Sequence, residues 1–300
     1  MKDYFMYDKK KCIVTGASSG MGRATVEMLV DLGADVYAVD ITPCKIKGIK
    51  KFIKCDLSNK EEIDKLFEKV PKNIHCFFGI AGLSGSKTDY ITTFNCNYTA
   101  NYYITMNYLP ERMKKGGSIV YVTSTAGLTW KDYQKEQLKV LKCNSWEEIQ
   151  QVIEPLAQIS PSTFAYMYSK RCLSHFACEK AIELGKLGIR INNVMPGSTD
   201  TGMKDEFQEM AGGEEALLNE TGTARRLATS EEMAGAIVFL NSEMATFISG
   251  VDFCVDSADN CMKILKLKKD REKVPATNKF ILKIAKKMMD KQRKSLPEGK

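Results

Sequence analysis

The sequence predicts an α/β fold in which helices cover both faces of a mainly parallel sheet. Short apolar stretches alternate with stretches of helical periodicity along most of the 300 residues. A glycine-rich segment, residues 15–22, follows the first apolar stretch and opens the first helix. Hydrophobic residues make up 44% of the chain, which is enough to bury a sheet between two helical layers. Right-handed crossovers then give a doubly wound fold with seven strands.

Each expected element is placed by its periodicity and by the glycines and polar residues that end it. The expected strands cover residues 11–15, 35–40, 52–56, 74–81, 117–123, 189–195 and 252–256. The expected helices cover residues 20–32, 59–70, 93–113, 163–184 and 231–240. We expect one domain over residues 1–261 and a separate C-terminal extension over residues 262–300.

The net charge of +7 is concentrated at one end of the chain. Residues 262–300 hold 14 Lys and Arg against 4 Asp and Glu, a charge of +10, so the remainder carries −3. A mildly acidic body argues against a nucleic-acid partner. Ten cysteines without a C-x-x-C pair, and two histidines whose neighbours suggest neither a triad nor a metal site, predict reduced thiols and no metal. With no leader or membrane span expected, the predicted location is cytoplasmic.

The glycine-rich segment has the context that a phosphate-binding loop requires. Gly16 allows a tight turn, while Gly20 and Gly22 let backbone and helix approach a pyrophosphate at the helix N-terminus. Asp40 ends the second expected strand, where a carboxylate accepts hydrogen bonds from both ribose hydroxyls and repels a 2′-phosphate. This predicts NAD rather than NADP, although Arg23 near the loop is a residue type that helps to bind NADP.

A tyrosine and a lysine four residues apart, Tyr166 and Lys170, lie on one face of the long helix expected at residues 163–184. A free tyrosine has a pKa near about 10, and a nearby cation favours the phenolate. Such a pair makes a proton donor and acceptor near neutral pH. Tyr168 is the competing tyrosine, but two residues from Lys170 it points away around the helix, so we expect it to pack in the interior.

Together and in this order, the motifs resemble the short-chain dehydrogenase/reductase family from about Lys10 to Met262. The end of the family's fourth-strand motif is present as Ala81 and Gly82, but Gly79-Ile80 stand where two asparagines are usual. The resemblance implies a Rossmann fold and an NAD site. The cofactor residues that it implies, together with those of the loop, are Gly16, Ser18, Ser19, Gly20, Met21, Gly22, Asp40, Asp56, Leu57, Ala81, Gly82, Tyr166, Lys170, Pro196, Gly197, Thr199 and Thr201.

The resemblance also implies the catalytic roles. Tyr166 would be the general acid/base, and Lys170 would lower its pKa and hold the nicotinamide ribose. Ser124 would hydrogen-bond the substrate oxygen, and Asn97 would hold the water that links Lys170 to solvent. The implied activity is hydride transfer between an alcohol or ketone and the nicotinamide, in a homodimer or homotetramer.

A helical insertion, together with Ala38-Val-Asp40-Ile41, Asp56-Leu-Ser58 and Ala81-Gly-Leu83, resembles 3α-hydroxysteroid dehydrogenase/carbonyl reductase members, which implies steroid or bile-acid substrates. Residues 128–162 add a helical insertion before the catalytic helix, at about 133–141 and 146–153. It could cap the substrate cleft, cover the helix through which family members pair, or form a peripheral hairpin. Residues 198–227 are the expected lid, with Met203 and Phe207 as substrate contacts and Met210 and Leu217 as further apolar candidates.

The C-terminal extension departs from the family. The last strand runs into Asp256-Ser-Ala-Asp259 where Asp-Gly-Gly is usual, and residues 277–294 read as a basic amphipathic helix. That helix could lie on an anionic membrane, dock on another subunit, or pack lightly on its own body. Three functions stay open: an NAD-dependent hydroxysteroid dehydrogenase, a reductase of a non-steroid carbonyl, and a catalytically silent NAD-binding regulator.

Overall fold

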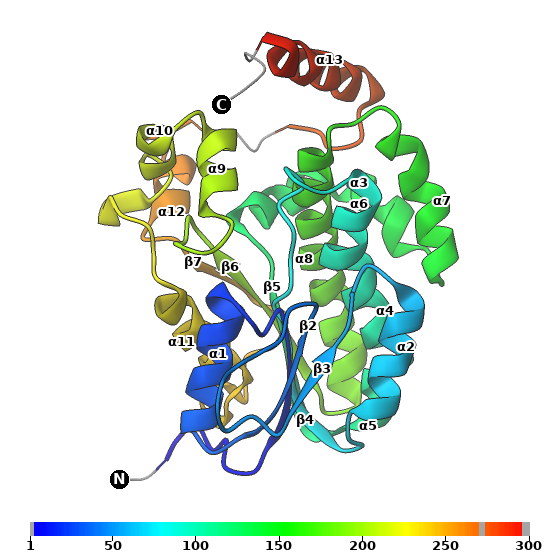
Figure 1. Cartoon of the computed structure of the whole chain (residues 1–300), viewed down its shortest axis with the longest axis vertical. Helices are drawn as coiled ribbons and strands as arrows, with labels where there is room; N and C mark the ends of the chain where they lie inside the picture. The colour runs from blue at the N-terminus through cyan, green and yellow to red at the C-terminus, as the bar shows by residue number, and fades with distance from the viewer. Residues whose placement is uncertain (1–2, 270–273, 296–300) are drawn as a thin grey trace.

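The computed structural model describes residues 3–269 and 274–295. Within them a seven-stranded sheet runs through the molecule in the order β3-β2-β1-β4-β5-β6-β7 (Figure 1). The doubly wound fold is confirmed, and the sheet is parallel throughout. The strands are β1 Lys11–Thr15, β2 Asp35–Asp40, β3 Lys51–Lys54, β4 Ile74–Gly79, β5 Met113–Val122, β6 Arg190–Pro196 and β7 Asp252–Val255.

Helices fill the connections between the strands and extend beyond the last one. The α-helices are α1 Gly20–Asp31, α2 Lys60–Lys69, α3 Tyr90–Phe94, α4 Ala100–Asn107, α5 Leu109–Arg112, α6 Gln134–Leu141, α7 Trp146–Ala157, α8 Ser162–Lys186, α9 Lys204–Ala211, α10 Glu214–Leu218, α11 Ser230–Asn241, α12 Asp259–Ile264 and α13 Lys279–Ser295. A π-helix, η1, spans Asn95–Thr99, and three 3₁₀ segments are η2 Thr125–Tyr133, η3 Gly222–Ala224 and η4 Glu243–Ala245.

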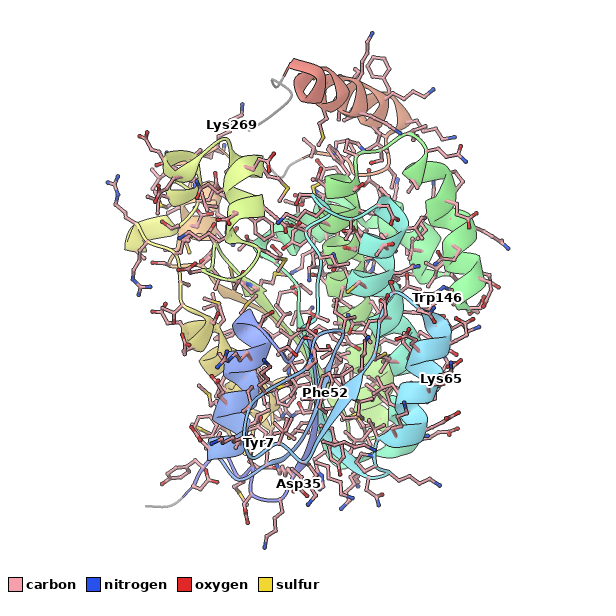
Figure 2. The ribbon with its side chains drawn as sticks, viewed as in Figure 1. Tyr7, Asp35, Phe52, Lys65, Trp146 and Lys269 are labelled. Atoms are coloured by element: carbon pink, nitrogen blue, oxygen red, sulfur yellow. The ribbon has the colours of Figure 1, made fainter. Side chains whose placement is uncertain are left out.

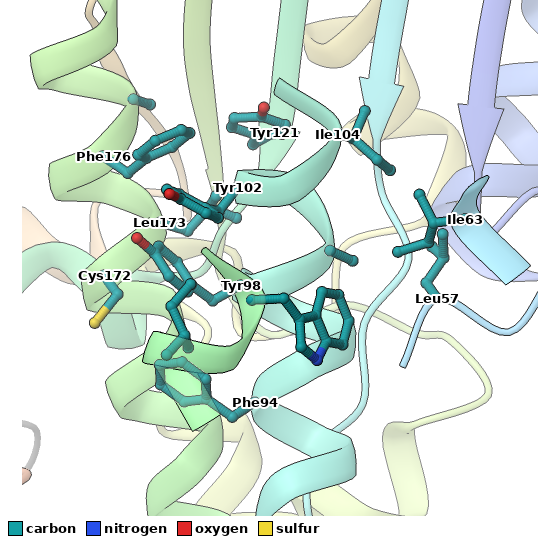
Figure 3. Packing of buried hydrophobic residues seen from close by; sticks show 14 of the residues in the cluster. Leu57, Ile63, Phe94, Tyr98, Tyr102, Ile104, Tyr121, Cys172, Leu173 and Phe176 are labelled. Carbon is teal, nitrogen blue, oxygen red and sulfur yellow. The ribbon is translucent and has the colours of Figure 1, made fainter. Parts of the chain in front are cut away.

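Each face of the sheet has its own hydrophobic core. On one face α1 and α11 pack together. Val26 and Leu29 of α1 and Ile237 of α11 are fully buried there. On the other face, α2, α4 and α8 cover the sheet. Figure 3 shows the aromatic part of this second core, where the rings of Tyr98 and Phe176 meet edge to face at 6.1 Å. That packing fixes the helix that carries Asn97 against the helix that carries Tyr166.

The helix expected over residues 93–113 is four segments rather than one. It starts earlier, at Tyr90, because the Asp89 side chain accepts a hydrogen bond from the Thr92 amide and caps it. The π-helix at residues 95–99 then inserts an extra residue into the turn that holds Asn97. The short α5 begins at Leu109 with Pro110 in its first turn, and β5 starts at Met113, four residues before the expected strand.

The insertion packs beside α8 and contributes no residue to the lining of the cavity that Tyr166 borders. The Tyr168 hydroxyl donates to the Glu136 carbonyl oxygen of α6 at 2.8 Å. Gln150 of α7 exchanges side-chain hydrogen bonds with Asn95, at 2.8 and 3.2 Å. Trp146 meets the Tyr103 ring edge to face at 5.8 Å. The contacts with α8 argue against a cap over the cleft, and they leave open a cover over the helix through which family members pair and a peripheral hairpin.

The chain leaves β7 by a backbone path that usually needs glycine. Ser257 and Ala258 both have positive φ angles, +51° and +67°. These are the positions at which the family that the sequence resembles has Gly-Gly, so the left-handed turn is formed without the residues that adopt it most easily. Asp259 then starts α12, a helix that the sequence did not predict. The expected helix at 277–294 is confirmed as α13, whose Leu282 is fully buried against the body.

Candidate active site

Two adjoining hollows lie along the carboxyl edge of the sheet, near the point where the strand order reverses between β1 and β4. The first is a groove of about 340 Å³ that includes Gly16, Gly20, Asp40, Leu57 and Gly82 in its lining. The second is a cavity of about 430 Å³ that includes Ser124 and Tyr166. Met21, Thr201 and Met203 line both, so a ligand spanning the two can extend from Asp40 toward Tyr166.

The glycine loop is as close-packed as a phosphate cradle requires. Gly16 has a φ of +69°, and a Cβ there would lie 2.8 Å from the backbone of Ala81. A Cβ at Gly22 would collide with the Gly16 carbonyl oxygen, so α1 approaches β1 only because this residue has no side chain. Ser19, Gly20, Met21 and Gly22 at the start of α1 line the groove, where a helix N-terminus favours a phosphate. The chain's own geometry thus fits a dinucleotide.

Asp40 is held in a fixed orientation at the end of β2. Its Oδ2 accepts from the Ser18 amide at 3.0 Å, and its Oδ1 accepts from the Thr42 amide at 2.9 Å. Ser18 is not a lining residue of the groove, so its place in the predicted cofactor set is that of a support for Asp40. Arg23 pairs with Glu27 along the exposed side of α1, at 2.9 Å, and it too is absent from the groove lining.

At positions 79 and 80, where the asparagine pair is missing, side chains from two other elements contact the end of β4. The Thr15 hydroxyl accepts hydrogen bonds from the amides of Ile80, at 3.0 Å, and Ala81, at 3.3 Å. At Gly79 a Cβ would lie 2.5 Å from the Asn101 Oδ1 and 2.6 Å from the Tyr121 ring. A glycine at position 79 therefore leaves the space in which Asn101 lies against the sheet.

Tyr166 and Lys170 lie on one face of α8, as predicted. The Lys170 ammonium is 5.7 Å from the centroid of the Tyr166 ring and donates to the Val122 carbonyl oxygen at 2.8 Å. Burial lowers the pKa of Lys170 to about 8. Tyr168 is fully buried, with its ring 5.4 Å from that of Phe94. Its environment is that of a packing residue, whereas Tyr166 borders the cavity.

Asn97 is fully buried and joins the loop after β4 to α8. Its amide group makes a two-way contact with Leu83, accepting from the Leu83 amide at 2.8 Å and donating to its carbonyl oxygen at 2.9 Å. It also donates to the Ser169 hydroxyl, which in turn donates to the Tyr166 carbonyl oxygen. Ser169 was not predicted, because one serine on a helix carries no spacing signal. The water that Asn97 is expected to hold stays a prediction.

The remaining predicted residues divide between the two hollows. Ser124 lies beside Tyr166 in the cavity lining, and its hydroxyl accepts from the Ala126 amide at 3.1 Å. The segment after β6 lines the same cavity. That segment contributes Pro196, Gly197, Thr199 and Thr201. In the groove, the remaining predicted lining residues are Ser19, Asp56 and Ala81.

The lid brings apolar side chains over the tyrosine. Phe207 of α9 meets the Tyr166 ring nearly edge to face, with centroids 5.5 Å apart. Met203, Met210 and Leu217 line the same cavity, so the four lid residues singled out in the sequence converge on it. The result is a mainly apolar chamber that also includes hydroxyl groups and, among others, the charged Glu220 and Lys263, which suits a hydrophobic alcohol or ketone.

Glu206, which the sequence analysis missed, ties the lid to the loop after β4. It accepts hydrogen bonds from the hydroxyls of Ser84 and Ser86, the latter at 2.7 Å, and pairs with Lys87 at 3.1 Å. Burial alone would raise the pKa of Glu206, but these hydrogen bonds outweigh it and hold the pKa below its ordinary value. An acidic residue in an acidic helix gave no sequence signal of this contact.

We expect Glu206→Gln to loosen the lid. The variant loses the charge on a group bonded to three donors, which costs about 1–2 kcal/mol of lid closure, or about five- to thirtyfold in the closing equilibrium. Substrate KM should rise and the lid should be cut faster in limited proteolysis. Glu209→Gln on the exposed side of the same helix is the matched control, and equal behaviour of the two variants would contradict this role.

A second missed group closes the far end of the cavity. Lys263 of α12 pairs with Asp259 at 2.9 Å and with Glu220 of the lid at 3.5 Å. Lys268 pairs with the same two carboxylates, with Glu220 at 3.3 Å. Asp259 is nearly inaccessible, and although burial would raise its pKa, the hydrogen bonds from Lys268 and Lys263 lower it. The C-terminal extension thus contributes to the wall of the cavity.

Comparison with known proteins places this geometry in a family. Residues 10–134 match a family model described as short chain dehydrogenase, and residues 156–257 match one described as Enoyl-(Acyl carrier protein) reductase. The gap between the two matches falls within the helical insertion. A coniferyl-alcohol dehydrogenase from a Pseudomonas species is 31% identical over 248 residues, covering 82% of this chain and 95% of that protein. The chain belongs to the short-chain dehydrogenase/reductase family, a family of oxidoreductases.

Solved structures share the fold. The 3-alpha-hydroxysteroid dehydrogenase from Pseudomonas sp. B-0831, complexed with NADH, superposes with a TM-score of 0.71. It is 21% identical, and the match covers 87% of this chain and all of that one. BdcA in complex with NADPH has a TM-score of 0.61 at 21% identity, over 84% of this chain and 95% of that one. At these identities the likeness concerns the fold.

Proposed function

We propose that the protein is an NAD-dependent dehydrogenase of hydrophobic secondary alcohols, with 3α-hydroxysteroids or bile acids as its first substrate class. The observation that carries the proposal is the pairing of an apolar cavity over Tyr166 and Ser124 with a groove that ends at a fixed Asp40. Bound NAD supplies the hydride acceptor. Tyr166 takes the proton of the hydroxyl, Lys170 stabilises the phenolate, and Ser124 holds the substrate oxygen.

A second candidate, a dehydrogenase or reductase of non-steroid compounds, is favoured by the 31% identity to a coniferyl-alcohol dehydrogenase. A panel distinguishes the two. We would measure NADH formation with 3α-, 3β-, 7α-, 12α- and 17β-hydroxysteroids beside coniferyl alcohol and simple secondary alcohols. Turnover confined to the non-steroid alcohols would exclude the steroid proposal. No turnover with any of them, despite tight NAD binding, would instead favour the silent regulator.

The choice of NAD over NADP is supported by Asp40 and by the Arg23–Glu27 pair on the far side of α1. We expect Asp40→Ala to weaken NAD binding by about tenfold to a hundredfold, because hydrogen bonds from the ribose to a charged group are lost. NADP binding should improve, since the repulsion of its phosphate is removed. Fluorescence titration of both nucleotides measures this, with Asp31→Ala as the control. Tighter binding of NADP by the wild type would overturn the assignment.

The rate should depend on the charge of Lys170. Because burial lowers its pKa to about 8, the ammonium is present below that pH and lost above it. We therefore expect kcat/KM for alcohol oxidation to fall about tenfold per pH unit above pH ~8. Lys170→Arg keeps its charge to much higher pH. The fall of kcat/KM in this variant, its alkaline limb, should therefore begin at a higher pH, even if its maximal rate is lower. An unchanged alkaline limb in Lys170→Arg would assign that limb to another group.

We further propose a cytoplasmic homodimer or homotetramer. None of the described helices is long and apolar enough to cross a membrane. Because the insertion packs beside α8, we expect subunits to pair through another surface. Light scattering and crosslinking of the full chain test the assembly.

A further inference from the structure

The C-terminal extension exposes an unusual share of the molecule's apolar side chains. Seventeen large hydrophobic residues are exposed in the part of the chain that the structure describes, and six of them lie between residues 264 and 288. One ends α12, two follow it and three lie on α13. They are Ile264, Leu265, Leu267, Phe280, Ile284 and Met288. Contiguous exposed apolar surface on a protein marks a place where something else binds.

The exposed face of α13 is built from two parallel rows. Phe280, Ile284 and Met288 are spaced four residues apart and are 74%, 44% and 67% exposed. Lys279, Lys283 and Lys287 precede them one by one, so a row of exposed lysines runs directly beside the apolar row. No carboxylate among the described side chains forms a salt bridge with these three lysines.

The opposite face of α13 already has a partner. Leu282 is fully buried, and the Lys286 ammonium donates to the Gln158 carbonyl oxygen at the end of α7, at 2.7 Å. The helix is therefore fixed to the body by one face, while the apolar and lysine rows face away from it. The light packing that the sequence left open describes the face that carries Leu282, but it leaves the apolar row on the other face exposed.

The second apolar group lies at the same end of the molecule. Ile264, Leu265 and Leu267 are each about 70% exposed, and the Leu267 amide donates to the Met262 carbonyl oxygen, which fixes the turn that presents them. Lys266 and Lys269 accompany them. Figure 2 labels Lys269 in the part of the molecule that also holds α13. Figure 1 shows α12 beside the lid helices α9 and α10 in that part.

We propose that this end of the protein, the α12 turn together with the outer face of α13, docks on the surface of an anionic lipid bilayer. An amphipathic helix with lysines beside its apolar row is suited to lie in the headgroup region, with Phe280, Ile284 and Met288 directed toward the acyl chains. The charges fit as well, since residues 262–300 carry +10 on a body of −3.

The alternatives fit less well. A second copy meeting this surface across a two-fold axis would bring the same lysine rows together. A nucleic acid would use the lysines but not the apolar row beside them. Because Ile264 directly follows Lys263, which lines the substrate cavity, docking would place that wall of the cavity close to the bilayer. The docking itself does not depend on which alcohol is oxidised.

The test is flotation of the full-length protein with vesicles of phosphatidylcholine, with and without phosphatidylglycerol. We expect binding only to the anionic vesicles. The triple variant Phe280→Ser, Ile284→Ser, Met288→Ser should bind at least about tenfold more weakly. The triple variant Lys279→Gln, Lys283→Gln, Lys287→Gln should lose about a hundredfold, at about fivefold per lysine.

Matched controls use exposed residues elsewhere on the molecule. Ile182→Ser with Phe247→Ser, and Lys45→Gln with Lys65→Gln and Lys135→Gln, should bind as the wild type does. Turnover of a water-soluble alcohol should be unchanged in every variant, which separates this test from that of the catalytic proposal. Absent binding by the wild type, or equal binding by the apolar triple variant, would overturn the proposal. So would a dimer that the apolar triple variant converts to monomer without any vesicle binding.

Discussion

Tyr166→Phe should reduce turnover by about a hundredfold to ten-thousandfold while leaving cofactor binding intact. The variant removes only the hydroxyl that would exchange the proton with the substrate, and positioned acid–base groups contribute rate factors of this size. The ring would keep its contact with Phe207 of the lid, so the cavity should keep its shape. Steady-state kinetics beside NAD titration measures the two effects separately.

Tyr168→Phe is the matched control on the same helix. Its hydroxyl bonds the Glu136 carbonyl oxygen of the insertion and lies outside the cavity lining, so we expect a change in stability and little change in turnover. If Tyr166→Phe turned over near the wild-type rate with cofactor bound, another group would have to be the acid/base. If Tyr168→Phe were the inactive variant, the assignment within the pair would be reversed.

Arg171→Leu should lower the free energy of unfolding by about 3–5 kcal/mol, because removing one partner of a buried polar network leaves the others unpaired. The arginine is fully buried. It donates to the Thr129 hydroxyl at 3.0 Å and to the Val274 carbonyl oxygen at 2.9 Å, and its guanidinium lies 4.5 Å from the centre of the Tyr133 ring. One side chain thus joins the catalytic helix, the start of the insertion and the segment before α13.

Chemical denaturation followed by circular dichroism measures this effect. Arg23→Leu is the control, because Arg23 is an exposed residue whose ion pair with Glu27 is open to solvent, and its transition should not move. Faster proteolysis after residue 269 in Arg171→Leu would show that the C-terminal segment has been released with the arginine. Coincident unfolding curves for the two variants would contradict the structural role.

Predictions that rest on local patterns agree well with the structure. Strand β2, Asp35–Asp40, ends where the sequence places it, because its apolar run and its terminal aspartate are both local features. The position of the glycine loop is predictable for the same reason, because glycines such as Gly16 and Gly22 are needed where a helix approaches a strand this closely. Boundaries set by distant partners were less predictable. The π-helix around Asn97 and the early start of β5 depend on packing between elements far apart in the chain.

The sequence by itself determined the doubly wound fold, the family, and the placing of Tyr166, Lys170, Ser124 and Asp40 along one edge of the sheet. These follow from periodicity and from short motifs whose spacing is fixed by a helix or a strand. Only the tertiary structure decided how the rest of the site is completed. Glu206 meets Ser84 across the cleft, Asn101 fills the space beside Gly79, and Lys263 closes the cavity from a helix beyond the last strand. Those contacts join residues up to 122 positions apart, as for Glu206 and Ser84, and no local pattern encodes such a pairing. Long-range packing also decides the exposed face of α13. Its sequence shows that it is amphipathic, but which face is exposed depends on which side packs on the body.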